Sequence, residues 1–395
     1  MFGFTPREIP AELREPRIVL GQDFLTRKVF LQATQTETVT RILSKIGTVD
    51  DIAVGELDSS QGIDVVIAGK NGAIITDYSG VKRLHTMYDF EIEKRKFSIF
   101  DFPNPHTLLG DIRIIDIEGD QVCEYLGRGS TDGAAIFAHD GKRLWSYVRT
   151  LNEKTSIEDL APGDVNGDGI LEFIAGWNSW NNIDKDRIAL LDRYGKQKWT
   201  EPVDYIYSQA EVVDVNGDGK NEIIHSNGSN MTIRNAQGSI LKVIKMPFYF
   251  SHFALCNAPG TNKPHILAVE DGAIWLTDFE GKVTARFDAP LSKVSVTPYK
   301  TPPLDIVWDS ESVYKAKGTL VKFSDTGPEY LAIIANFAVI ERSLLYLFSA
   351  EGKLVYQEVI PAECNAIAVL PKSEGKMSQA LLVGGEQIVW RYDVR

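Results

Sequence analysis

Two acidic segments of this sequence carry the same residue types at the same spacing. Counted from Asp164 and from Asp214, side chains with oxygen atoms occupy positions 1, 3, 5 and 9, and glycine occupies position 6. This pattern suits a hard cation, because Ca²⁺ takes about six to eight oxygen ligands and the glycine permits a sharp turn. We expect position 7 to add its backbone carbonyl. The predicted calcium ligands are Asp164, Asn166, Asp168, Ile170 and Glu172 in the first loop and Asp214, Asn216, Asp218, Lys220 and Glu222 in the second.

The spacing is not that of an EF-hand. An EF-hand needs a glutamate at position 12, followed by a helix. Here position 12 is Ala175 or His225, and a strand-like apolar run begins directly after position 9. The alternative to a calcium loop is a turn without metal, since Asn, Asp and Gly dominate turns in general. Two complete copies, each followed by an apolar strand, favour calcium.

A third segment matches the pattern less completely. Its candidate ligands are Asp116, Glu118, Asp120, Val122 and Glu124. Gln121 replaces the glycine at position 6, so the turn there has a conformational cost. A fourth, weaker copy has Glu56, Asp58, Ser60 and Asp64 in register. A bound cation and a bare turn stay open as alternatives for both segments.

The acidic loops belong to a longer internal repeat, which predicts a β-propeller. A residue at position 9 followed by an apolar strand recurs seven times, about fifty residues apart. The seven copies begin at Asp64, Glu124, Glu172, Glu222, His265, Glu329 and Gln379. A second signal, an Asp-x-x-Gly turn or a variant of it between two apolar strands, accompanies the repeat. Four short strands per repeat and no convincing helix are typical of a propeller blade.

The predicted fold is therefore all-β: a seven-bladed β-propeller with four-stranded antiparallel blades and the acidic loops between first and second strands. We expect residues 1–16 to form an N-terminal arm and residues 17–395 to form a single propeller. The last copy ends before its fourth strand, so we expect residues 17–34 to supply that strand and close the ring, which removes an open edge. The expected blades span about residues 44–100, 107–150, 156–202, 207–246, 250–288, 292–360 and 363–395.

One stretch of the chain disturbs the repeat. Between residues 287 and 328 the distance between the two signals grows, with about twenty additional residues. Residues 299–327 are either an insertion or an irregular eighth blade, and the sequence leaves both alternatives open.

Composition limits the possible partners. The formal net charge of −12 argues against a nucleic-acid interface, which needs a basic stripe. The sequence contains no apolar run long enough for a transmembrane helix, and its N-terminus lacks the layout of a secretion signal. We therefore expect the chain to be extracellular or periplasmic if a leader was removed, and cytoplasmic otherwise. Three dispersed cysteines favour buried thiols over a disulfide framework.

The two complete loops give the chain a family resemblance. The segments from Leu160 to Gly169 and from Val213 to Glu222 resemble the FG-GAP, or VCBS-type, repeat that builds the propellers of integrin alpha chains, many bacterial surface proteins and some polysaccharide lyases. The resemblance implies a loop that joins the first two strands of a blade and binds Ca²⁺ through positions 1, 3, 5, 7 and 9. The Phe-Gly and Gly-Ala-Pro signatures of that family are absent from this sequence.

The function expected from these patterns is a calcium-stabilised binding or scaffolding module for a protein or glycan partner. Candidate ligand-binding residues are Trp177, Trp180, Asn181 and Arg128, because tryptophan can stack on a sugar and asparagine can bind its hydroxyls. We expect them in the loops that connect the second and third strands of their blades, opposite the calcium loops. The alternative is a polysaccharide lyase, for which His252, His139, Tyr207 and Arg128 are candidates but no motif joins them. A third reading rests on Trp145 and Trp199, whose surroundings faintly resemble the tryptophan-docking repeats of quinoprotein dehydrogenases.

Overall fold

The structure of the protein is a computed structural model of the whole chain. The residues that it describes are 9–32, 49–57, 62–69, 72–87, 108–117, 122–129, 133–148, 155–179, 187–203, 210–227, 229–247, 253–258, 263–270, 272–301, 306–313, 315–337, 340–372 and 379–395. The helix α1 (Ala11–Arg14) is four residues long. Within these ranges no helix is both long and apolar enough to cross a membrane.

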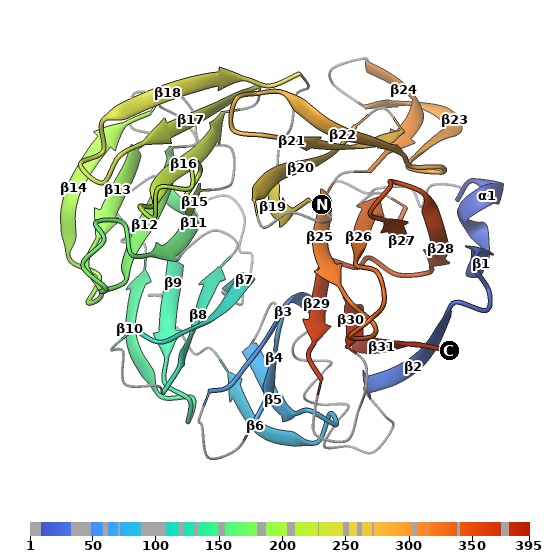
Figure 1. Cartoon of the computed structure of the whole chain (residues 1–395), viewed down its shortest axis with the longest axis horizontal. Helices are drawn as coiled ribbons and strands as arrows, with labels where there is room; N and C mark the ends of the chain where they lie inside the picture. Colours follow the sequence, from blue (N-terminus) through green and yellow to red (C-terminus); the bar gives the residue numbers. More distant parts are fainter. Residues whose placement is uncertain are drawn as a thin grey trace. The chain divides into compact units, whose positions relative to one another are not determined.

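The chain forms seven blades of four antiparallel strands, the composition of a propeller. Figure 1 labels the strands of each blade. The predicted fold class and the predicted number of blades are confirmed. The chain divides into two compact units, one of Leu31–His252 and the other of Met1–Phe30 together with Phe253–Arg395. Blades one to four belong to the first of these units, and blades five to seven belong to the second.

In blades one to four, strand order across each sheet follows the order along the chain. The first strands of neighbouring blades contact each other, β3 with β7 and β11 with β15. The strands are β3 (Val49–Gly55), β4 (Asp64–Gly69), β5 (Gly72–Asp77) and β6 (Lys82–Met87) in blade one; β7 (Leu108–Ile115), β8 (Glu124–Gly129), β9 (Gly133–Phe137) and β10 (Arg143–Val148) in blade two; β11 (Thr155–Gly163), β12 (Glu172–Ser179), β13 (Arg187–Leu191) and β14 (Gln197–Pro202) in blade three; and β15 (Ala210–Val213), β16 (Glu222–Asn227), β17 (Asn230–Arg234) and β18 (Ile240–Lys245) in blade four.

The other unit holds three blades and a separate hairpin. Blade five contains β19 (Ala254–Asn257), β20 (Pro264–Glu270), β21 (Ala273–Thr277) and β22 (Val283–Asp288). Blade six contains β25 (Lys315–Val321), β26 (Tyr330–Phe337), β27 (Arg342–Ser349) and β28 (Leu354–Ile360), and blade seven contains β29 (Ala366–Leu370), β30 (Ala380–Gly385) and β31 (Ile388–Val394). The hairpin consists of β23 (Lys293–Thr301) and β24 (Ile306–Ser312), which form a two-stranded sheet. Among the described residues, the stretch 299–327 is thus the end of a hairpin followed by the first strand of blade six, not a four-stranded eighth blade.

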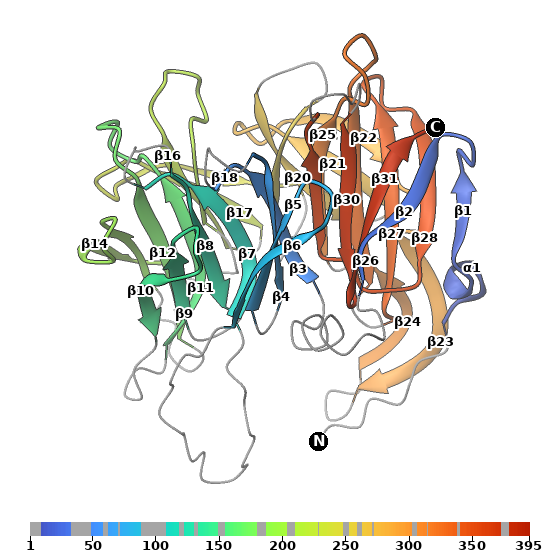
Figure 2. The same ribbon diagram turned by 90° about the horizontal axis from the view of Figure 1, so that it is seen from below.

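The N-terminal segment contributes a strand to each of the last two blades (Figure 2). Strand β2 (Leu25–Gln32) lies beside β31 and is the fourth strand of blade seven, whereas β1 (Arg17–Leu20) lies beside β28 as a fifth strand of blade six. The expectation that all of residues 17–34 complete the last blade is therefore wrong for β1. The physical reason is a turn at Gly21, whose φ of 76° and carbonyl bond to the Phe24 N–H (2.9 Å) separate the two strands.

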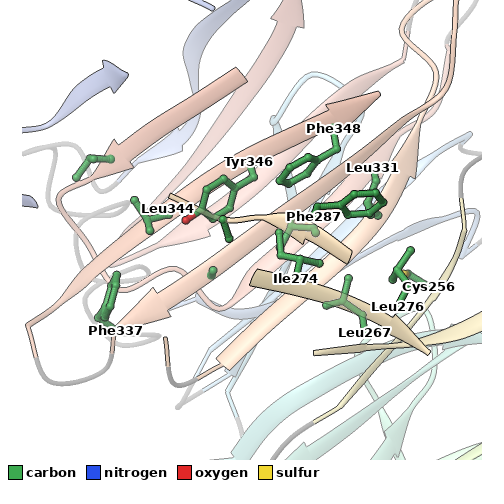
Figure 3. Close-up of a cluster of buried hydrophobic side chains, with 14 of the residues drawn as sticks. Cys256, Leu267, Ile274, Leu276, Phe287, Leu331, Phe337, Leu344, Tyr346 and Phe348 are labelled. Carbon is green, nitrogen blue, oxygen red and sulfur yellow. The ribbon is translucent and has the colours of Figure 1, made fainter. Parts of the chain in front are cut away.

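The blades pack through their apolar second and third strands. All six residues of β4 are buried, as are seven of the eight in β26. In the core of blades five and six, Phe287 stacks on Phe348 with ring centroids 5.2 Å apart, and Phe348 stacks on Tyr346 at 5.9 Å (Figure 3). These strands are apolar along their length because a blade has a neighbour on each face, which removes the alternation that a half-exposed strand shows.

The turn between the third and fourth strands has one design in several blades. The Oδ1 of Asp192 accepts the N–H groups of Tyr194 (3.0 Å) and Lys196 (2.8 Å). Gly195 completes this turn with a φ of 80°, a conformation that side chains with a Cβ rarely adopt. The same two acceptor contacts occur at Asp77, Asn235 and Asp278. The Asp-x-x-Gly signal of the sequence is thus a hydrogen-bonded turn.

Candidate functional site

The first acidic loop connects β11 to β12, and hydrogen bonds to the side chain of Asp164 fix its conformation. Its Oδ1 accepts the N–H groups of Gly167 (2.7 Å) and Asp168 (3.1 Å), and its Oδ2 accepts that of Gly169 (2.9 Å). The side chains of Asn166 and Asp168 each accept one further N–H, from Asp168 (2.9 Å) and from Ile170 (2.8 Å). Every side chain predicted to bind metal at positions 1, 3 and 5 is therefore fixed by the backbone of its own loop.

The second loop, between β15 and β16, repeats these five hydrogen bonds and adds one from the Asn216 N–H to Asp214 Oδ1 (3.2 Å). Asp214 accepts the N–H groups of Gly217 (2.6 Å) and Asp218 (3.2 Å) through Oδ1 and that of Gly219 (2.8 Å) through Oδ2. Position 3 again accepts from position 5 at 2.8 Å, and position 5 again accepts from position 7 at 2.9 Å. Gly219 has a φ of 83° with no heavy atom within 4 Å of a built Cβ, so the backbone angle and not crowding requires glycine. These N–H groups, that of Gly219 first, lower the pKa of Asp214.

In four blades the acid at position 9 forms a hydrogen bond across the base of the loop. It accepts the N–H of the residue seven places earlier in each case. The pairs are Asp64 with Leu57 (3.2 Å), Glu124 with Ile117 (3.0 Å), Glu172 with Val165 (3.1 Å) and Glu222 with Val215 (3.2 Å). All four acids are buried. An acid persists at position 9 in blades one and two, where the glycine at position 6 is missing. This residue therefore has a structural role in the loop besides its predicted role as a ligand.

The two complete loops differ in what neutralises position 9. Glu172, 1% exposed, has the Nζ of Lys198 at 2.6 Å from its Oε1, and the side-chain amide of Asn166 donates to the same oxygen. Glu222, 8% exposed, has no ion pair among the described residues. In blade four, Leu241 occupies the place of Lys198, at the register shift between the third and fourth strands. Burial raises the pKa of Glu222, and the charges of Asp218 and Asp214 raise it further.

The two loops are also joined to each other. The side-chain amide of Asn221, at position 8 of the second loop, donates to the backbone carbonyl of Asp164 at 2.8 Å. A change in the shape of one loop therefore acts directly on the first residue of the other. Sequence reasoning missed both Asn221 and Lys198, because neither belongs to the ligand pattern.

The donor set of each loop fits a hard cation. It contains three carboxylates, one amide oxygen and one backbone carbonyl, and Ca²⁺ prefers oxygen ligands. A carboxylate has about four acceptor directions, so Asp168 and Asp218, which each accept one loop N–H, retain capacity for a cation. At position 1, Asp164 accepts three N–H groups and Asp214 accepts four, so a cation there would replace some of these hydrogen bonds. In the part of the chain that the structure describes, no three acidic, histidine or cysteine side chains converge as a metal site. The loop carboxylates contact loop amides and, at Glu172, a lysine.

The weaker copies are described only in part. Asp116, Val122 and Glu124 of the third loop lie within the described residues, and Glu118 and Asp120 lie outside them. In blade one, the guanidinium group of Arg83 forms an ion pair with Asp64 at 2.5 Å and already neutralises this acid. Asp58 and Ser60 of that loop lie outside the described residues.

The structure places two of the predicted ligand-binding residues on strands. Trp177 lies in β12, where it pairs with Ile157 and Arg187, and Arg128 lies in β8. Both were expected in connecting loops, so that expectation is wrong for these two positions. Trp180 and Asn181 lie outside the described residues, as do Tyr207 and His252. His139 follows β9 in an exposed turn.

Trp145 and Trp199 connect neighbouring blades. The indole N–H of Trp145 donates to the Arg193 carbonyl of blade three, and that of Trp199 donates to the Ala236 carbonyl of blade four, each at 2.9 Å. A Cβ built on Gly238 would lie 3.2 Å from the Trp199 ring. The aromatic residue of one blade thus packs under the glycine turn of the next, which gives these tryptophans a structural role.

Comparison with known proteins identifies a fold and no family. No protein-family model and no curated protein matches the chain. The crystal structure of BBS1N in complex with ARL6DN superposes with a TM-score of 0.57 at 10% sequence identity, over 93% of this chain and 94% of that one. The Pan2 WD40 domain of Neurospora crassa gives 0.54 at 10% identity, over 94% and 95%. Raptor of Chaetomium thermophilum gives 0.52 at 10% identity, over 92% of this chain and 30% of Raptor.

Proposed function

We propose that this chain is a binding module, a propeller that is stabilised by calcium at its acidic loops and that holds a protein partner. The observation that carries the binding role is the shared fold. BBS1N, which resembles the chain over nearly the full length of both, is seen in complex with ARL6DN. A propeller suits this role because it presents loops and blade edges on a rigid scaffold.

Calcium has a structural role in this proposal. Each complete loop holds three carboxylates in a short segment, and their mutual repulsion opposes the closed conformation unless a cation offsets it. The matching hydrogen-bond scaffolds around Asp164 and Asp214 support the proposal, since they hold the predicted ligands in one arrangement in both loops. At a free cation concentration about a thousandfold above the Kd, binding adds about 4 kcal/mol to the free energy of unfolding.

Affinity capture from cells in which the chain is native tests the binding role. The tagged protein is purified in calcium and, in parallel, in chelator, with the double variant Asp164→Asn/Asp214→Asn as the loop control. We expect one partner protein at constant stoichiometry with the wild-type chain, and less of it after chelation and with the variant, as the blades loosen. Recovery of no stoichiometric partner under either condition would contradict a protein-binding role.

A glycan partner and a lyase activity are the alternatives that the same preparation can test. A polysaccharide lyase needs a base and charge neutralisation of the uronate. Binding to a glycan array without cleavage would replace the protein partner by a glycan partner. Formation of unsaturated, ultraviolet-absorbing products from uronate oligosaccharides would identify an enzyme and would overturn the proposed function.

A further inference from the structure

The outer strand of blade four exposes apolar side chains in series. Strand β18 lies at the end of its sheet (Figure 1). Ile240, Leu241 and Val243 are 56%, 56% and 55% exposed. An apolar strand at a sheet edge also presents unpaired backbone N–H and C=O groups, which makes it a template for another strand.

Blade six shows how this fold covers such an edge. Its outer strand β28 is paired with β1, with Arg17 opposite Val359, Ile18 opposite Glu358 and Leu20 opposite Gln357. With β1 in place, these residues of β28 are buried. An outer strand of this propeller can therefore accept a fifth, antiparallel strand.

The register places β18 in the same geometry as β28. In each blade a register shift falls at the start of the fourth strand, after Ile233 in blade four and after Leu347 in blade six. Val243 pairs with Thr232 as Gln357 pairs with Tyr346. Val243, Ile244 and Lys245 thus hold the positions at which Gln357, Glu358 and Val359 receive β1.

The charge of the strand indicates the kind of partner. From Gly238 to Pro247 the chain has two lysines, Lys242 and Lys245, and no acid, whereas the whole chain carries a net charge of −12. A second copy paired through β18 would bring lysines together and would join two acidic molecules. Acidic side chains on the incoming strand would instead complement Lys245.

We propose that residues 243–245 of β18 accept, by antiparallel pairing, an extended segment of a partner protein that carries β-branched and acidic side chains. The proposal rests on the binding role proposed above and names the surface that performs it. Backbone hydrogen bonds supply the affinity in this mode of recognition, and alternate side chains supply the specificity. Val243 selects an apolar residue and Lys245 selects an acid, and Ile240 and Leu241 extend the exposed apolar surface beyond the paired residues.

Selection from a displayed library of random peptides, with the calcium-loaded full chain as bait, tests this surface. We expect enriched peptides to carry a β-branched and an acidic residue two positions apart, because the exposed Val243 and Lys245 lie on one face of β18. A synthetic copy of the most enriched peptide should slow amide hydrogen exchange at residues 243–245. Val243→Asp should weaken its binding by about tenfold, because an ionised carboxylate would replace an apolar contact. The matched variant Leu144→Asp, at the exposed outer strand of blade two, should bind as the wild type does.

A charge swap tests the acidic part of the proposal. Lys245→Glu should lose the acidic peptide and bind a version in which lysine replaces the acids. Protection from exchange at another surface, or equal binding by Val243→Asp and wild type, would overturn the β18 site while leaving the binding role in place. If the chain forms a dimer and Val243→Asp abolishes it, the strand that pairs with β18 belongs to a second copy of this chain and not to a partner protein. Absence of enriched peptides together with absence of a captured partner would remove the binding role itself.

Discussion

Glu172 and Glu222 occupy the same position in two matching loops and have different neighbours. Lys198 neutralises Glu172, whereas Glu222 has burial and two nearby aspartates, which raise its pKa. The sequence predicts that both are calcium ligands but gives no indication of this difference. The difference arises because β14 has Lys198, and β18 has Leu241, at the equivalent register shift of each blade. Only the folded hairpin brings that position next to the acid.

The raised pKa of Glu222 predicts a pH dependence. The folded protein binds a proton at this site more tightly than the unfolded chain does, so stability falls as pH rises from about 4.3, the ordinary glutamate value, through the pKa of the folded state. In chelator we therefore expect Glu222→Gln to be more stable than wild type above this window and equally stable below it. Urea unfolding at about pH 4 and pH 7 measures the difference.

Calcium should reverse the sign of this effect. A saturating cation makes the charge of Glu222 favourable, so Glu222→Gln should be the less stable protein at neutral pH. Glu172→Gln is the matched control, and it should be less stable in both conditions because it loses the ion pair with Lys198. A Glu222→Gln protein less stable than wild type in chelator at pH 7 would refute this account of Glu222.

Lys198 should compete with calcium at the first loop. Substitution Lys198→Met frees Glu172, and we expect the calcium Kd of that loop to fall by about threefold, a small change since Lys198 is partly exposed. Calorimetric titration of metal-stripped protein measures it, with Lys196→Met on the neighbouring turn as control. A weaker or unchanged calcium affinity in Lys198→Met would exclude competition at Glu172.

At the scale of elements, the tryptophan of a fourth strand fixes its blade to the next. Trp199 combines apolar contact with Gly238 and a hydrogen bond to the Ala236 carbonyl. Sequence patterns predicted the strands, the acidic hairpins and the Asp-x-x-Gly turns, because each of these depends on residues within one repeat. Docking between blades depends on residues about forty positions apart, so no local pattern shows it.

Removal of the indole N–H tests this docking. Trp199→Phe should destabilise the protein by about 1 kcal/mol, the contribution of one hydrogen bond, plus the loss of ring contact. Trp145→Phe should behave alike, since it makes the equivalent bond to Arg193. The exposed Tyr194→Phe serves as the control in denaturant unfolding. A Trp199→Phe protein as stable as the Tyr194→Phe control would show that the bond contributes nothing.

At the scale of the molecule, the N-terminal segment holds blades six and seven together. β1 pairs with β28, β2 lies beside β31, and Arg27 of β2 forms an ion pair with the buried Glu358 of β28. Glu358 also accepts the Tyr356 hydroxyl at 2.7 Å. The incomplete last repeat predicted that an N-terminal strand would join blade seven, but the division of the segment into two strands depends on the turn at Gly21, which no repeat indicates.

Loss of Arg27 should weaken this attachment. Arg27→Met leaves the carboxylate of Glu358 buried without its cation, and we expect a cost of about 2–4 kcal/mol, reduced from a fully buried pair because Arg27 is partly exposed. The double variant Arg27→Met/Glu358→Gln removes the stranded charge and should regain most of that loss. Urea unfolding of the three proteins measures both changes, and a double variant no more stable than Arg27→Met would contradict a role for the buried charge.

Calcium is proposed to bind the acidic loops and thereby to stabilise the propeller. Thermal unfolding of metal-stripped protein, at free Ca²⁺ from nanomolar to millimolar, tests this proposal most directly. We predict that Tm rises with calcium in the wild type, rises less in Asp164→Asn or Asp214→Asn, and rises least in the double variant. A wild-type Tm that does not change at any calcium concentration would mean that these loops are hydrogen-bonded turns without a metal.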